Sequence, residues 1–119
     1  MKSENIIQER SFAFAIRIVR LYKYLSEEKK EFVMSKQLLR CGTSIGANIE
    51  ESIGGQSDKD FLSKLSISYK EAREPMYWIK LLLATDYLNK EQAESMLNDA
   101  EELCNILGKI QITMKNRNS

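Results

Sequence analysis

The chain has 119 residues, 43% of them hydrophobic and 29% charged, a balance typical of a folded protein with one core. It contains no histidine, and this excludes most enzymes and transition-metal sites, because histidine is the commonest general base and metal ligand. One proline and five glycines mark few turns, so long helices are expected rather than many short strands. We therefore expect residues 1–119 to form a single all-α domain.

The chain lacks the marks of export and of membrane insertion. No stretch approaches the roughly 18 apolar residues of a membrane span, and the N-terminal sequence has no apolar signal core. Cys41 and Cys104 lie far apart in apolar helical contexts, which is typical of buried thiols in a reducing compartment. These features predict a cytoplasmic protein with no membrane partner.

The first helix is expected over residues 6–25 and carries two apolar faces. Its core stripe is Ile7, Phe14, Ile18, Leu21 and Leu25. The second face comprises Phe12, Ala15, Ile16, Val19 and Tyr22. One neighbouring helix cannot cover both faces, so we interpret the second face as a contact between subunits.

After a charged turn at residues 26–31, a second helix is expected to begin with Ser35 as its N-cap. Its apolar stripe is Leu38, Cys41, Ile45 and Ile49. We expect it to end at Gly54-Gly55, a pair suited to a left-handed C-terminal cap.

This helix places small and polar side chains beside its apolar stripe. Gly42 and Gly46 lie one turn apart and would let a second backbone come close, although each costs about 1 kcal/mol relative to alanine. A polar stripe recurs at helical spacing: Arg40, Ser44, Asn48 and Glu51. Two interpretations remain open, a close helix crossing with a buried hydrogen-bonded seam, and a ligand or nucleic-acid site.

Two further helices complete the chain. The third is expected to open with Ser57 as N-cap, to continue through Pro75 with a kink, and to close at residues 85–88. The fourth should begin at a capping box of Asn89 and Gln92 and carry the cleanest amphipathic pattern, before a frayed tail over residues 115–119. Short links between four such helices predict an antiparallel up-down-up-down four-helix bundle.

Charged residues supply the remaining candidates for function. Residues 1–40 hold nine Lys and Arg against five Asp and Glu, a net charge of +4. The candidate nucleic-acid contacts are Arg17, Arg20, Lys23, Lys30 and Lys36, with the solvated face of a helix as the alternative. Glu50, Glu51, Glu71 and Glu74 form the only carboxylate cluster, and Glu71 and Glu74 are expected to pair with Arg40, Lys70 or Arg73 in the polar seam rather than to bind metal.

The pattern Arg40-x-x-x-Ser44-Ile45-x-x-Asn48-Ile49-x-Glu51, followed by Phe61, Leu65-x-Ile67 and Glu71-x-x-Glu74, resembles a bacterial family of four-helix-bundle proteins. These proteins are encoded in intervening sequences of 23S rRNA genes, and the resemblance covers nearly the whole chain. It implies a homopentamer with no established catalytic activity. The chain is also similar to the accessory proteins of diversity-generating retroelements, which are basic pentamers that engage nucleic acid.

From residues and resemblance together we expect a non-enzymatic homo-oligomeric scaffold, with no cofactor, no metal and no small-molecule substrate. The alternative is an RNA- or DNA-binding accessory factor that acts through a basic surface of the oligomer. Salt dependence separates the two, because phosphate-driven binding weakens steeply as salt rises.

Overall fold

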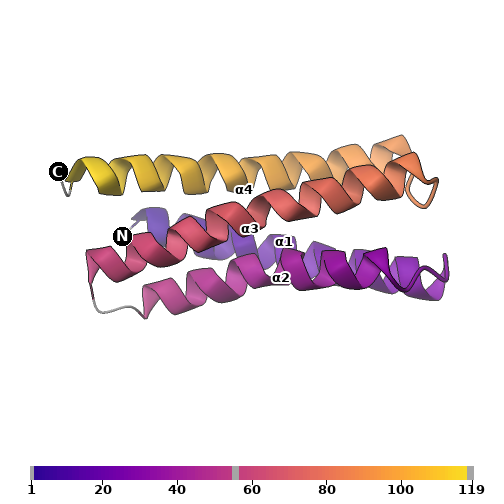
Figure 1. The fold of residues 1–119 in the computed structure, drawn as a ribbon, viewed down its shortest axis with the longest axis horizontal. Coiled ribbons are helices and arrows are strands. Elements are labelled where there is room, and N and C mark those ends of the chain that lie inside the picture. Colours follow the sequence, from indigo (N-terminus) through magenta and orange to yellow (C-terminus); the bar gives the residue numbers. More distant parts are fainter. Residues whose placement is uncertain (1, 55–56, 118–119) are drawn as a thin grey trace.

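The computed structural model describes residues 2–54 and 57–117, and within them the chain forms four α-helices and no strand. The helices are α1 (Lys2–Glu27), α2 (Met34–Ile53), α3 (Asp58–Ala84) and α4 (Lys90–Arg117). They lie lengthwise side by side, and the chain reverses direction at each connection (Figure 1). The expected all-α fold class is confirmed.

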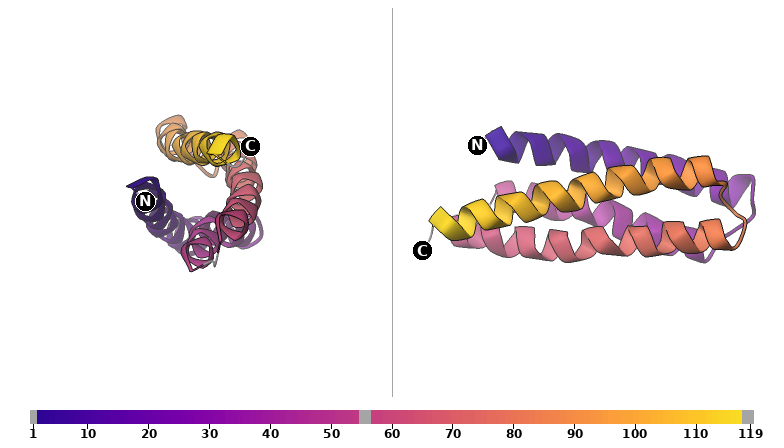
Figure 2. Two further views of the ribbon diagram at one scale, coloured as in Figure 1. Left: turned by 90° about the vertical axis from the view of Figure 1, so that its left-hand side faces the viewer. Right: turned by 90° about the horizontal axis from the view of Figure 1, so that it is seen from above.

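The helices follow one another around an arc when the molecule is viewed down its long axis (Figure 2). α2 packs against both α1 and α3, and α4 packs against α3, whereas the contact between α1 and α4 is much less extensive. The α1–α4 side is therefore the least extensively packed side of the molecule.

Apolar stripes of all four helices meet in one core, and their members agree with the sequence pattern. The predicted core positions of α1 and α2 that are buried are Ile7, Phe14, Ile18, Leu25, Leu38, Cys41, Ile45 and Ile49. The buried residues of α4 recur at helical spacing, as its amphipathic pattern predicts, and are Ala93, Met96, Ala100, Leu103, Cys104, Leu107, Ile110 and Met114. Each large side chain buried in this way contributes about 1.5–3 kcal/mol, so the core dominates the stability of the fold.

The predicted N-termini of α3 and α4 are confirmed. Ser57 Oγ accepts a hydrogen bond from the Asp60 amide at 3.1 Å. Asn89 Oδ1 accepts from the Gln92 amide at 2.8 Å, and Gln92 Oε1 accepts from the Asn89 amide at 2.9 Å. Each residue of this capping box thus satisfies an amide that the first turn of a helix leaves without an intrahelical partner.

The prediction for the start of α2 is wrong. Ser35 lies within the helix and its hydroxyl donates to the Glu31 carbonyl oxygen at 2.8 Å. The cap is the buried Glu31 carboxylate, which accepts from the amides of Val33, Met34 and Ser35 at 3.1, 3.1 and 2.7 Å. Burial alone would raise the pKa of Glu31, but these hydrogen bonds outweigh it and hold the pKa below its ordinary value.

Other helix ends also differ from expectation. Gly54 has φ −79° rather than a left-handed conformation, and Gly55 lies outside the described residues. The expected fraying is wrong for residues 115–117, which belong to α4, and residues 118–119 lie outside the described part.

α3 continues through the buried Pro75 as one helix, as the in-phase apolar pattern predicts, and a kink there stays a prediction. None of the helices in the described part is both long enough and apolar enough to span a bilayer.

Candidate functional site

The small residues of α2 lie against α1. A Cβ atom at Gly42 would come within 2.6 Å of Ile18 Cγ1, far inside van der Waals contact. A Cβ atom at Gly46 would lie 3.5 Å from the Ser11 carbonyl oxygen, an ordinary contact distance. The close approach expected from the glycines is therefore made between α1 and α2, with Gly42 at its tightest point.

The polar stripe of α2 faces a different neighbour, α3. The Arg40 guanidinium forms an ion pair with Glu74, and Glu74 Oε2 also accepts a hydrogen bond from Trp78 Nε1 at 2.9 Å. The Arg40 side chain is 57% exposed, so this part of the seam is not buried as the sequence suggested. Long charged side chains at a helix boundary keep their heads in water while their stems pack, which explains the difference.

The middle of the seam is centred on Asn48. Its Nδ2 donates to Glu71 Oε2 at 3.1 Å and to the Ser44 carbonyl oxygen at 3.0 Å, and it is half-buried. Glu51 lies outside this group and pairs with Lys64 at 3.0 Å. The polar seam therefore joins α2 to α3 within one chain.

Asn48→Ala should lower the free energy of unfolding by about 1 kcal/mol, since it leaves the half-buried Glu71 carboxylate without its α2 donor. Urea denaturation measures the change. Asn98→Ala, at an exposed position of α4, is the matched control and should change little. An Asn48→Ala protein as stable as the wild type would show that the contact is not structural.

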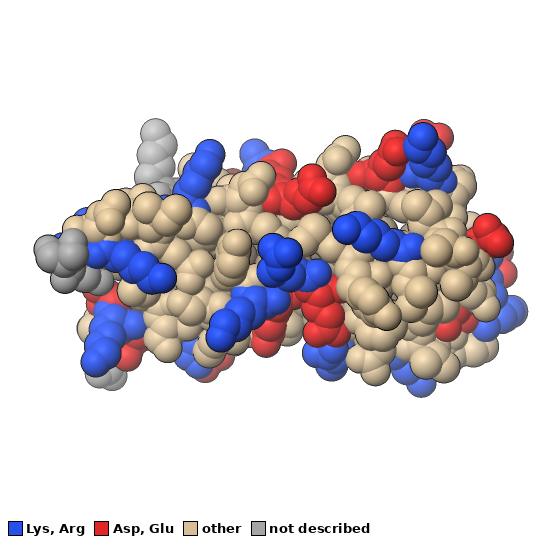
Figure 3. Space-filling view, turned by 45° about the horizontal axis from the view of Figure 1, so that its top comes forward, with Lys and Arg blue, Asp and Glu red and all other residues tan. Residues whose placement is uncertain are grey.

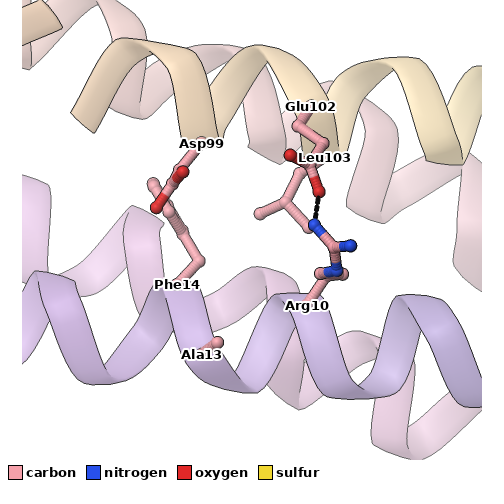
Figure 4. A pocket seen from close by; sticks show the side chains of 6 residues that line it. All are labelled: Arg10, Ala13, Phe14, Asp99, Glu102 and Leu103. Atoms are coloured by element: carbon pink, nitrogen blue, oxygen red, sulfur yellow. Dashed lines mark hydrogen bonds and ion pairs between the residues drawn. The ribbon is translucent and has the colours of Figure 1, made fainter. Parts of the chain in front are cut away.

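A second polar seam joins α1 to α4 beside a pocket of about 130 Å³. Figure 4 shows Arg10 of α1 reaching Glu102 of α4, with which it forms an ion pair. One turn before Glu102, Asp99 Oδ2 lies 2.5 Å from Arg17 Nη1, and Ser95 Oγ accepts from Arg17 Nη2 at 2.8 Å. The charged groups around this pocket are already paired with one another, so it offers little to a ligand.

This pairing removes Arg17 from the exposed candidates for nucleic-acid contact, because its side chain points to α4 and its charge is offset by Asp99. Arg20, Lys23, Lys30 and Lys36 are exposed and form no ion pair with another described residue. Lys30 has a left-handed backbone, with φ 55°, in the turn before α2. Of the three predicted contacts on α1, Arg20 and Lys23 thus remain exposed and without an ion pair to another described residue, whereas Arg17 does not.

The four carboxylates singled out in the sequence do not converge. Each interacts with a different side chain: Gln8 for Glu50, Lys64 for Glu51, Asn48 for Glu71 and Arg40 for Glu74. In residues 2–54 and 57–117, no group of three or more His, Cys, Asp and Glu side chains is placed to hold a metal ion.

The two cysteines are buried free thiols. Burial, with a smaller contribution from the negative charge of Glu74, raises the pKa of Cys41 to about 12. Burial likewise raises the pKa of Cys104. At neutral pH both are protonated, and a thiol is a far weaker nucleophile than a thiolate.

The second apolar face of α1 is directed away from the core. Phe12 is 66% exposed, and Ile16 and Val19 are each nearly 40% exposed. Phe12 also borders a hollow of about 270 Å³ between α1 and α2, where Gly46 and Ala47 leave room. A contiguous apolar surface of this kind is a mark of protein–protein contact.

The chain is similar to known proteins over most of its length. The model of the 23S rRNA-intervening sequence protein family matches residues 3–109. A solved structure, from the S23 ribosomal protein family of Bacteroides thetaiotaomicron VPI-5482 and of unknown function, is 52% identical with a TM-score of 0.89. That match covers 92% of this chain and 97% of the other. A search of curated proteins found no match.

Proposed function

Because this chain belongs to the family of 23S rRNA-intervening sequence proteins, we propose that it is a non-enzymatic cytoplasmic scaffold that assembles with copies of itself. The proposed subunit is an antiparallel up-down-up-down bundle with a bend at Pro75, and the proposed assembly is a pentamer. One observation carries the proposal: the exposed apolar face of α1, formed by Phe12, Ile16 and Val19.

An apolar face that is left in water is unfavourable in free energy, and association with another copy removes it from water. An aromatic side chain can bury about 150–250 Å² in a contact, and burial is favourable by about 25 cal/mol per Å². The adjoining hollow beside Gly46 and Ala47 supplies the concave surface that an inserted side chain needs. Head-to-tail contacts, in which this face meets a different surface of the next copy, form a ring when the rotation from one copy to the next closes.

Light scattering after size exclusion tests the assembly. We expect a mass of about five times the 13.8 kDa chain, since association buries the α1 face. The double substitution Phe12→Asp and Ile16→Asp should yield monomers, because it would place two charges in the contact. Ile112→Asp is the control, as Ile112 is 62% exposed on α4. A monomeric wild type at micromolar concentration would contradict the proposal, as would an equal loss of mass in the control.

An RNA- or DNA-binding accessory role is the second candidate. Its support is that Arg20 and Lys23, which flank the apolar face of α1, form no ion pair with another described residue. Against it stand the formal charge of +1 and the interspersed positive and negative side chains on the face drawn in Figure 3. Binding of this kind must weaken steeply with salt.

A further inference from the structure

The outer side of α3 carries a stripe of cations that the sequence pattern did not single out. Beyond the first turn, the exposed positions of α3 recur every three or four residues and so share one face. They are Ser63, Ile67, Lys70, Arg73, Tyr77, Lys80 and Ala84. α3 packs between α2 and α4 (Figure 2), and these are the positions of α3 that neither neighbour buries. It contains three positive charges and no negative one.

These three cations are not used by the fold. Within the described part of the chain, Lys70, Arg73 and Lys80 form no ion pair, in contrast to Arg17 and Arg40. Their charges are therefore available to a partner, and none has to break an ion pair with another described residue to reach it.

An aromatic side chain stands among the cations. Tyr77 is 60% exposed, and its ring meets the Trp78 ring edge-on with centroids 5.1 Å apart. Trp78 is held in turn by its hydrogen bond to Glu74. Tyr77 therefore packs against a neighbour that is itself held in place, and it should lose little side-chain entropy when a partner covers it. Tyrosines of this kind are enriched among the residues that contribute most to binding energy at interfaces.

A hollow of about 310 Å³ between α3 and α4 adjoins the stripe. Two of the cations, Arg73 and Lys80, line it. The other lining residues are Met76, Glu101, Cys104 and Asn105. Met76 and Cys104 make part of its surface apolar, and methionine adapts readily to the shape of an inserted side chain.

We propose that the face formed by Lys70, Arg73, Tyr77 and Lys80, with the adjoining hollow, binds an acidic amphipathic helix of a partner protein. The inference rests on the proposed scaffold function, for which it names the class of partner. The acidic side chains of that helix would pair with the three cations, and an apolar side chain would enter the hollow beside Met76. Lys70 and Lys80 are ten residues apart, or about 15 Å along α3, which roughly three turns of a partner helix would match.

A nucleic acid fits the same surface less well. Binding driven by the phosphate backbone depends on the number of phosphates that cations neutralise, and this stripe offers three cations in each chain. The apolar part of the hollow, formed by Met76 and Cys104, would gain nothing from a phosphate, whereas it can take an apolar side chain of an amphipathic helix. On the face drawn in Figure 3, positive and negative side chains are interspersed, which weakens the attraction of that face for a polyanion.

Fluorescence anisotropy tests the inference on the full chain at low salt. The probe is a labelled synthetic helix about three heptads long, with leucines along one side and glutamates flanking them. A lysine-for-glutamate version and a single-stranded oligouridine of similar length are the comparison probes. The stripe variant is Lys70→Glu, Arg73→Glu and Lys80→Glu. The charge-matched control is Lys36→Glu, Lys59→Glu and Lys115→Glu, all at exposed positions elsewhere.

We expect the glutamate peptide to bind the wild type and the control alike, and to bind the stripe variant at least about tenfold more weakly, because three attractions become repulsions. Tyr77→Ala should weaken binding several-fold without any change of charge. No binding of the glutamate peptide by the wild type would overturn the inference, as would equal losses in stripe variant and control. If oligouridine bound the wild type more strongly than the glutamate peptide did, and the stripe variant did not bind it, the face would be assigned to nucleic acid instead.

The mass of each sample, measured by light scattering, separates this inference from the scaffold proposal. Peptide binding by a monomeric wild type would support the docking face and overturn only the assembly. Failure to bind by an assembled wild type would overturn only the docking face.

Discussion

Gly42→Ala should lower the free energy of unfolding by up to about 2 kcal/mol. The added Cβ would lie within 3.0 Å of three atoms of Ile18, a β-branched side chain that is fully buried and has little room to move. Overpacking of this kind costs about 1–3 kcal/mol, and the better helix propensity of alanine offsets only about 1 kcal/mol of that.

Gly46→Ala is the matched control, because it makes the same chemical change one turn away on the same face. Its Cβ would meet no atom nearer than the Ser11 carbonyl oxygen at 3.5 Å, so the gain in helix propensity should remain and stabilise the protein by up to about 1 kcal/mol. Urea denaturation of both variants at one protein concentration gives the difference. Equal effects at the two glycines would show that α1 and α2 do not cross closely at Gly42.

Glu31→Ala should cost about 2–3 kcal/mol of stability at neutral pH. The Glu31 carboxylate is the acceptor for three amides at the start of α2, and hydrogen bonds to a charged group are worth more than neutral ones. Substitution leaves those amides without their acceptor at a largely buried position. Glu28→Ala, at an exposed position in the same turn, should change stability little and serves as the control.

The effect should also depend on pH in a defined direction. The pKa of Glu31 is lower in the folded protein than in the unfolded chain, so its contribution is fully present above the unfolded pKa of about 4.3. It is lost as the pH falls through the lower, folded pKa. The stability gap between wild type and Glu31→Ala should therefore be constant near neutrality and narrow below about pH 4. A gap that stays the same in acid would mean that the charge of Glu31 does not stabilise α2.

The sequence by itself determined the helices and most of the core. Periodicity placed Phe14, Ile18 and Leu38 inside because burial follows the side of a helix on which a residue lies, whatever its neighbour is. The capping box of Asn89 and Gln92 could likewise be predicted from the sequence, because both residues lie within one turn of each other. The cap of α2 was missed because glutamate is not among the residues that usually cap a helix, whereas serine is.

Only the tertiary structure decided which surface each residue meets. Gly42 and Arg40 lie on one helix, yet Gly42 contacts α1 and Arg40 contacts α3, so the single polar crossing expected from sequence is two separate contacts. The charge of Arg17 is offset because Asp99, 82 residues away in the sequence, lies 2.5 Å from its guanidinium group. The stripe around Tyr77 could be identified only from the packing of α2 and α4 against the other sides of α3, which shows which positions of α3 stay exposed. Periodicity is a local property of a helix, whereas the partner of each face depends on how distant helices pack.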